Sequence, residues 1–192
     1  MKIRLLQTII LVVFIAVLLG VGWYLFLRKD GTTLLTYSNP AYGLSFSYPD
    51  NYKLSESAAT GNQHGTVVTL TERGISIPKN GEGPTAITIG MYEGLGTSTS
   101  LLSWVKTSPY SNFNLSGTTT PGSTTVSNKP ALLYTWDGLY QGTSLAVEHG
   151  GNIILFAVTY DGETDLKKRS DFTDLVTSVR FGDVTTGTTT SN

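Results

Sequence analysis

Cysteine is missing from all 192 residues of the chain. Disulfide bonds, thiolate metal sites and cysteine nucleophiles are therefore excluded. Charged residues are also scarce, at 14% of the sequence, where an average soluble domain has about 25%. Hydrophobic residues, at 40%, are nevertheless numerous enough to build a core. This length and composition are typical of one domain with an additional segment.

The few charges are unevenly distributed along the chain. Lys2, Arg4, Arg28 and Lys29, together with Asp30, flank the first apolar segment. The rest of the chain keeps nine of the 13 basic residues and 13 of the 14 acidic residues, which gives it a net charge of −4. Its longest basic run is the three residues Lys167 to Arg169, and it contains no stripe of basic and aromatic residues. This distribution argues against nucleic acid as a partner.

The segment from Leu5 to Leu27 has 23 residues and no charge. As a helix it would be about 34 Å long, enough to cross a hydrocarbon core of about 30 Å. Trp23 and Tyr24 lie near its second end, where aromatic side chains favour the membrane interface. A cleaved signal peptide has a shorter apolar region of about 7–15 residues. We therefore expect a single transmembrane helix.

The same segment predicts the orientation of the chain across the membrane. A tail of only four residues precedes the apolar span, as in an uncleaved signal sequence, which carries everything after it across the membrane. We expect residues 1–31 to form the tail and a signal-anchor helix, single-pass in the cell membrane. Residues 32–182 would form an extracytoplasmic domain, and the threonine-rich residues 183–192 a disordered tail.

Alternating apolar and polar residues predict most of the strands of this domain. Polar residues between Ser55 and Gly65 indicate a loop, whereas the nearly continuous apolar run from Ile153 to Val158 indicates a central strand covered on both faces. Asn128-Lys129 and Gly150-Gly151 have the composition of hairpin turns. The expected strands are Leu34–Tyr37, Leu44–Tyr48, Thr66–Glu72, Ala86–Tyr92, Ser123–Ser127, Ala131–Trp136, Ser144–Glu148 and Ile153–Tyr160.

Two segments have the periodicity of helices. The first begins near Ser100, and the second is capped by Thr164. In the second helix, we expect Lys167, Lys168 and Arg169 to face water. Its expected buried side consists of Leu166, Phe172, Leu175, Val176 and Val179. The fold class is therefore α+β, with a mostly antiparallel sheet of about seven or eight strands packed by two helices.

The stretch YSNPAYGLSFSYPDNY, from Tyr37 to Tyr52, resembles the entrance of the PsbP and Mog1-like domains. Two later segments are similar to the mid-domain hairpin and the closing helix and strand of that family: residues 126–131, and the apolar positions from Phe172 to Phe181. The resemblance covers about Leu34 to Phe181, and together with the predicted anchor the chain resembles a membrane-anchored, bacterial-type member of this family. The entrance positions that carry it are Tyr37, Gly43, Leu44, Phe46, Tyr48, Pro49 and Tyr52.

Several motifs are similar in part to catalytic, metal-binding or phosphate-binding sites. His149-Gly150-Gly151 is similar to an esterase oxyanion loop, but the chain has no Gly-x-Ser-x-Gly nucleophile elbow. Gly94-Leu95-Gly96 lacks the third glycine of a dinucleotide loop and the lysine of a Walker motif. His64 stands in a polar loop without a ligand at metal-binding spacing. We predict a hairpin turn, a strand-to-helix turn and a surface histidine, respectively.

The acidic clusters also have simpler explanations. Asp161, Glu163 and Asp165 alternate as in a calcium loop, but the positions for glycine and the closing glutamate hold Leu166 and Phe172. We expect a turn followed by acidic residues in the first turn of a helix. Asp171 and Asp174 are predicted to lie on a solvated helix face, and Asn114-Leu-Ser116 is a common chance match to a glycosylation site. We expect Trp104, Trp136 and Phe156 in the core.

These observations favour a non-enzymatic, membrane-anchored domain that binds or stabilises a protein partner outside the cytoplasm. The sequence identifies no catalytic residue, no metal ligand and no cofactor. The resemblance implies accessory and interaction roles: photosynthetic members assist photosystem II and a eukaryotic branch binds a small GTPase, but no residues here match either role. The alternatives are a small-ligand-binding or sensory module, and a hydrolase with a serine near His64 or His149.

Overall fold

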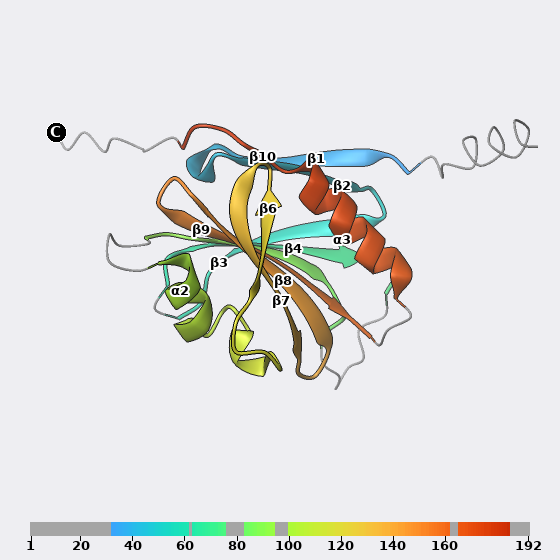
Figure 1. Ribbon diagram of the computed structural model, residues 1–192. Helices are drawn as coiled ribbons and strands as arrows, with labels where there is room; N and C mark the ends of the chain where they lie inside the picture. The colour runs from blue at the N-terminus through green and yellow to red at the C-terminus, as the bar shows by residue number, and fades with distance from the viewer. Residues whose placement is uncertain (1–31, 62, 76–82, 95–99, 162–164, 185–192) are drawn as a thin grey trace, which may run out of the picture. The chain divides into compact units, whose positions relative to one another are not determined.

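The described residues form ten strands in two antiparallel sheets, with two α-helices packed on them (Figure 1). The computed structural model describes residues 32–61, 63–75, 83–94, 100–161 and 165–184. The chain divides into two units, 1–33 and 34–192, of which the second contains the fold. The predicted transmembrane helix and the threonine-rich tail lie outside the described residues. Within the described ranges, no helix is both long enough and apolar enough to span a bilayer.

The larger sheet has seven strands, and every pair of neighbours is antiparallel. The apolar run predicted to be central lies in β9, which has three strands on either side and is buried along most of its length. This part of the prediction is confirmed. In spatial order the strands are β3 (Tyr52–Ala58), β4 (Gly65–Glu72), β5 (Ile87–Tyr92), β9 (Asn152–Tyr160), β8 (Gln141–His149), β7 (Lys129–Asp137) and β6 (Gly122–Val126).

The entrance stretch forms a separate sheet with the end of the domain. Strands β1 (Leu34–Asn39) and β2 (Leu44–Pro49) are joined by a short 3₁₀ turn and pair with each other. Strand β10 (Arg180–Phe181) pairs with the other side of β2. Gly43 ends the turn with a φ of +57°, which explains the glycine in the entrance motif. The expected single sheet of seven or eight strands is therefore corrected to sheets of three and seven strands.

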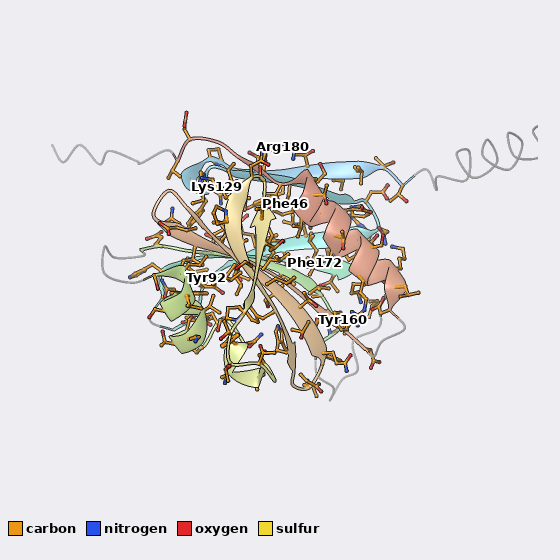
Figure 2. The ribbon with its side chains drawn as sticks, in the orientation of Figure 1. Phe46, Tyr92, Lys129, Tyr160, Phe172 and Arg180 are labelled. Carbon is orange, nitrogen blue, oxygen red and sulfur yellow. The ribbon has the colours of Figure 1, made fainter. Side chains whose placement is uncertain are left out.

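The seven-stranded sheet carries a hydrophobic core on each face. Helix α3 (Leu166–Ser178) and the small sheet cover one face, with Phe46 and Phe172 buried between the layers. Helix α2 (Leu101–Thr107) and the short helix η2 (Phe113–Leu115) cover the other, over Tyr92. Figure 2 shows Phe172 beneath α3 and Tyr92 beside α2. The fold is a three-layer α+β arrangement.

Strand β3 occupies part of the segment from Ser55 to Gly65, where the sequence predicts a polar loop, so this prediction is wrong for Ser55 to Ala58. It lies at the edge of the sheet, where only Tyr52 is buried and Leu54 half-buried. Lys53 and Glu56 are charged residues of the kind that protect an exposed edge from further pairing. An edge strand with one solvent-exposed face and few apolar residues has too weak an alternation of apolar and polar residues to be recognised.

The two predicted hairpin turns differ in outcome. Gly150 and Gly151 form the two-residue turn between β8 and β9, with φ of +59° and +76°, as expected. The turn between β6 and β7 is Ser127-Asn128, one residue earlier than predicted, because Val126 pairs directly with Lys129. Ser127 and Asn128 both have positive φ, and asparagine tolerates this region better than lysine.

The orientation of α3 is partly confirmed and partly wrong. Phe172 is 5% exposed and Leu175 is 1% exposed, as predicted. Leu166, predicted to be buried, is 73% exposed, whereas Lys168, predicted to face water, is 3% exposed. The buried positions repeat at Lys168, Phe172, Leu175 and Val179, so a charged residue takes the first place in the apolar stripe.

Candidate functional site

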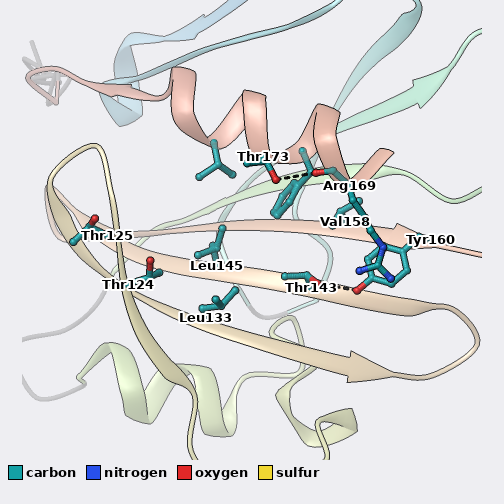
Figure 3. A pocket seen from close by; sticks show the side chains of 11 residues that line it. Thr124, Thr125, Leu133, Thr143, Leu145, Val158, Tyr160, Arg169 and Thr173 are labelled. Carbon is teal, nitrogen blue, oxygen red and sulfur yellow. Dashed lines mark hydrogen bonds between the residues drawn. The ribbon is translucent and has the colours of Figure 1, made fainter. Parts of the chain in front are cut away.

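A groove runs beside α3, over the part of the seven-stranded sheet that this helix leaves uncovered; we call it the α3 groove. Its central hollow has a volume of about 320 Å³. Figure 3 shows α3 along one side, with side chains of β7, β8 and β9 beneath it. The lining residues are Thr124, Thr125, Leu133, Thr143, Leu145, Val158, Tyr160, Arg169, Phe172, Thr173 and Val176.

The groove continues past both ends of the central hollow. A hollow of about 260 Å³, which contains Asp137, shares Tyr160 and Arg169 with it. A hollow of about 470 Å³, which reaches Arg180, shares Thr125 and Val176 with it. These shared residues make the three hollows one elongated surface.

Helix α3 supplies this surface with a regular row of side chains. Arg169, Thr173 and Val176 have the spacing of one helix face, and Arg180, the first residue of β10, continues their row beyond the end of the helix. This row lies one residue further along the chain than the buried row that begins at Lys168. The helix therefore packs its buried row on the sheet and presents the adjacent row to the groove.

Arg169 is held flat against an aromatic ring. Its guanidinium carbon lies 3.6 Å from the centre of the Tyr160 ring, and the Tyr160 hydroxyl is hydrogen-bonded to the Thr143 hydroxyl at 2.8 Å. A cation over an aromatic face is stabilised by the charge distribution of the ring. The Nε atom of Arg169 is buried and has no hydrogen-bond acceptor among the described residues. The orientation of this guanidinium is thus fixed by stacking rather than by an ion pair.

Arg180 occupies the other end of the row. Its Nη1 atom donates to the carbonyl oxygens of Val179 at 2.8 Å and Thr177 at 3.2 Å. No carboxylate of the described residues lies within ion-pair distance of Arg169 or Arg180. The α3 groove therefore carries two guanidinium groups whose charge is not neutralised by a described neighbour.

A second polar cluster surrounds Lys168 on the opposite flank of α3. The Lys168 ammonium donates to the Thr85 hydroxyl and lies 3.3 Å from Asp165 and 3.8 Å from Glu72. Asp165 also accepts from the Lys168 backbone amide and caps the helix. The sequence placed this cap at Thr164, which lies outside the described residues. The cluster joins the start of α3 to β4, and its buried lysine makes a structural role the simplest explanation.

Tyr52 extends this cluster to the edge strand β3. Its hydroxyl donates to Asp171 at 2.8 Å and lies 3.3 Å from Glu72. Burial, followed by the hydrogen bond to Asp171, raises the pKa of Tyr52 well above its usual value. Tyr52 is therefore a neutral donor. Asp171 also pairs with Lys167 at 2.7 Å, so only Asp174 has the solvated position that was predicted for both aspartates.

His149 is a structural residue at the tip of β8. Its Nε2 atom lies 2.9 Å from the Gly182 carbonyl oxygen, to which a neutral ring can donate, and its ring packs on Phe181 at 4.6 Å between centres. Burial lowers the pKa of His149, which favours this neutral form. The buried serines, Ser111 and Ser144, bond to other groups. The hydrolase alternative therefore gains no support from His149.

The remaining candidates are placed as follows. His64 is an exposed residue that precedes β4, as predicted. Trp104, Trp136 and Phe156 are buried in the two cores, also as predicted. Among the described residues no group of three potential ligands could hold a metal ion. Parts of two motifs lie outside the described residues: Glu163 of the acidic motif, and Leu95 and Gly96 of the glycine motif.

The layered arrangement of sheet and helices defines a PsbP-like fold. The solution structure of cyanobacterial PsbP, CyanoP, from Synechocystis sp. PCC 6803 superimposes on this chain with a TM-score of 0.51. The match covers 81% of this chain and 96% of that one at 13% sequence identity, so it establishes similarity of fold alone. No protein-family model and no curated protein sequence matches the chain.

Proposed function

We propose that this chain is a membrane-anchored, extracytoplasmic protein that is not an enzyme and binds a protein partner through the α3 groove. The observation that carries the proposal is the groove itself: an elongated surface in three connected hollows, lined by threonine hydroxyls, apolar side chains and two arginines. Such a mixture of apolar and neutral polar groups, with arginine, is common where proteins bind one another.

The chemistry of the groove also favours binding over catalysis. A general base or nucleophile needs a hydrogen-bonded partner that activates it. The lining residues include two arginines and one carboxylate, Asp137, but no histidine. The PsbP-like fold and the resemblance at the entrance stretch are compatible with an extrinsic domain that interacts with other proteins.

A photocrosslinking amino acid at position 133 tests the proposed function. Leu133 is 37% exposed and lines the groove, whereas Leu102 is 39% exposed and lies on α2, on the other side of the sheet. We expect discrete adducts with a protein from position 133 but not from position 102, in cells that naturally make the protein. Thr173→Trp, which narrows the groove at an exposed helix position, should abolish them.

The outcomes are distinct. Equal adducts from positions 133 and 102 would mean that the groove has no special role. A total absence of adducts, with stable protein present, would contradict partner binding through this surface. Adducts with a small molecule only would favour the ligand-binding alternative.

The location of the domain is a separate part of this proposal. Thr188→Cys would introduce the only thiol in the protein, because the sequence has no cysteine. In intact cells, or in spheroplasts where an outer membrane intervenes, we expect a membrane-impermeant maleimide to label this cysteine. Labelling that occurs only after lysis would place the domain in the cytoplasm. The unsubstituted protein, which cannot react, is the control.

A further inference from the structure

We infer that the α3 groove binds an extended peptide segment of a partner protein, with two acidic side chains about five residues apart. One carboxylate would pair with Arg169 and the other with Arg180. This inference rests on the proposed function and adds the chemistry of the partner.

The charges of the groove point to an acidic partner. Both arginines lie in the lining, and neither pairs with a described carboxylate, although the domain as a whole is negative. Asp137 lies in the hollow beyond Arg169 and Asp174 is not in the lining, so the stretch between the arginines contains no described carboxylate. Arginine forms paired hydrogen bonds with carboxylates, and stacking on Tyr160 orients one of the two guanidinium groups.

The spacing of the arginines sets the spacing of the acidic residues. Arg169 and Arg180 are eleven positions apart. Nine helical rises of about 1.5 Å reach Ser178, roughly 14 Å along α3. Arg180 follows two residues later at the start of β10, and an extended backbone adds at most about 3.3 Å per residue, so the interval is roughly 14–20 Å. An extended segment advances about 3.3 Å per residue. Four to six residues of an extended peptide, about five, therefore cover the interval.

The size of the groove favours an extended segment over a helix. A helix with its side chains is about 10 Å across or wider, so only one of its faces could enter the groove, whereas an extended segment can lie within it. The two hollows between the arginines have volumes of about 320 and 470 Å³. An extended peptide could bury apolar side chains against Leu133 and Leu145 and form hydrogen bonds with Thr124 and Thr143.

Selection from a displayed library of random twelve-residue peptides tests the inference. The target is the full chain in detergent micelles, with the Arg169→Gln/Arg180→Gln protein as the parallel target. We expect the unsubstituted protein to enrich peptides with two acidic residues four to six positions apart, and the double variant not to. The inference is wrong if neutral or basic peptides predominate, or if both proteins select the same sequences.

The best selected peptide then provides a quantitative readout. Arg169→Gln and Arg180→Gln should each raise its Kd at least tenfold, and replacing its two acidic residues with their amides should do the same. Lys53→Gln, an equal change of charge on the opposite edge of the sheet, should leave the Kd within twofold. Equal losses in all three variants would indicate a non-specific charge effect and refute the inference.

Additional measurements distinguish a folding defect of the variants, binding to lipid, and failure of this inference alone. Arg169→Lys keeps the charge but not the paired hydrogen bonds, so it should weaken binding even if Arg169→Gln fails to fold. Arginine-dependent binding to phosphatidylglycerol vesicles without any selected peptide would assign the groove to a lipid surface and overturn the inference. If crosslinks from position 133 persist in the double variant, the proposed function stands and this inference fails.

Discussion

Replacing Phe172 with alanine is expected to lower the free energy of unfolding by about 3–5 kcal/mol, the usual cost of deleting a buried aromatic side chain. Phe172 is 5% exposed and lies in the core shared by α3, the small sheet and the large sheet. The loss is a large part of a typical total stability of about 5–15 kcal/mol. The expected observable is a markedly lower urea midpoint for the full chain in detergent.

Leu166→Ala is the matched control for this measurement. Leu166 belongs to the same helix but is 73% exposed, so its truncation should change stability by about 0.5 kcal/mol or less. Equal effects of the two substitutions, or no effect of Phe172→Ala, would show that the helix is oriented differently from the structure described above.

Lys168→Met is expected to destabilise the protein by about 2–4 kcal/mol. Methionine keeps much of the apolar stem but removes the ammonium group, which leaves Glu72 and Asp165 without their cation. Removing one partner of a fully buried ion pair costs about 3–5 kcal/mol. Here the two carboxylate side chains are 28% and 24% exposed, so water compensates for part of the loss.

Lys167→Met provides the comparison at the preceding position of the helix. The Lys167 side chain is 64% exposed and pairs with Asp171, a contact of the kind that contributes about 0.3–0.5 kcal/mol. The double substitution Lys168→Met/Glu72→Gln should recover part of the stability lost in Lys168→Met, because it removes one uncompensated charge. If Lys168→Met were no more damaging than Lys167→Met, the buried ion pairs would have no net stabilising role.

The features that could be predicted from the sequence are those with a strong local signal. Alternating residues from Leu44 to Tyr48 specify β2, the apolar run from Ile153 specifies β9, and paired glycines specify the turn after His149. Each depends on neighbours in the chain and on a simple burial rule. The edge strand β3 and the burial of Lys168 depend on partners far away in the sequence, so no local pattern revealed them.

The α3 groove was missed for a related reason. Its central hollow combines β6, β7, β8, β9 and α3, and no short motif encodes the space that a helix leaves uncovered on a sheet. One signal was available: Arg169, Thr173, Val176 and Arg180 repeat with helical spacing beside the buried row. Helical periodicity alone assigns Arg169 to the solvent-exposed side of the helix, because the ring of Tyr160 that orients it belongs to another element.

The small sheet determines how the domain would respond to tension between its two ends. Strands β1 and β10 both run antiparallel to β2, but Leu34 pairs with Pro49 at one end of β2 and Phe181 with Leu44 at the other. A pull on Leu34 and Phe181 in opposite directions therefore acts along the strands, across their hydrogen bonds. These bonds would be sheared together rather than unzipped one by one. Such an arrangement resists mechanical unfolding by a force applied between Leu34 and Phe181.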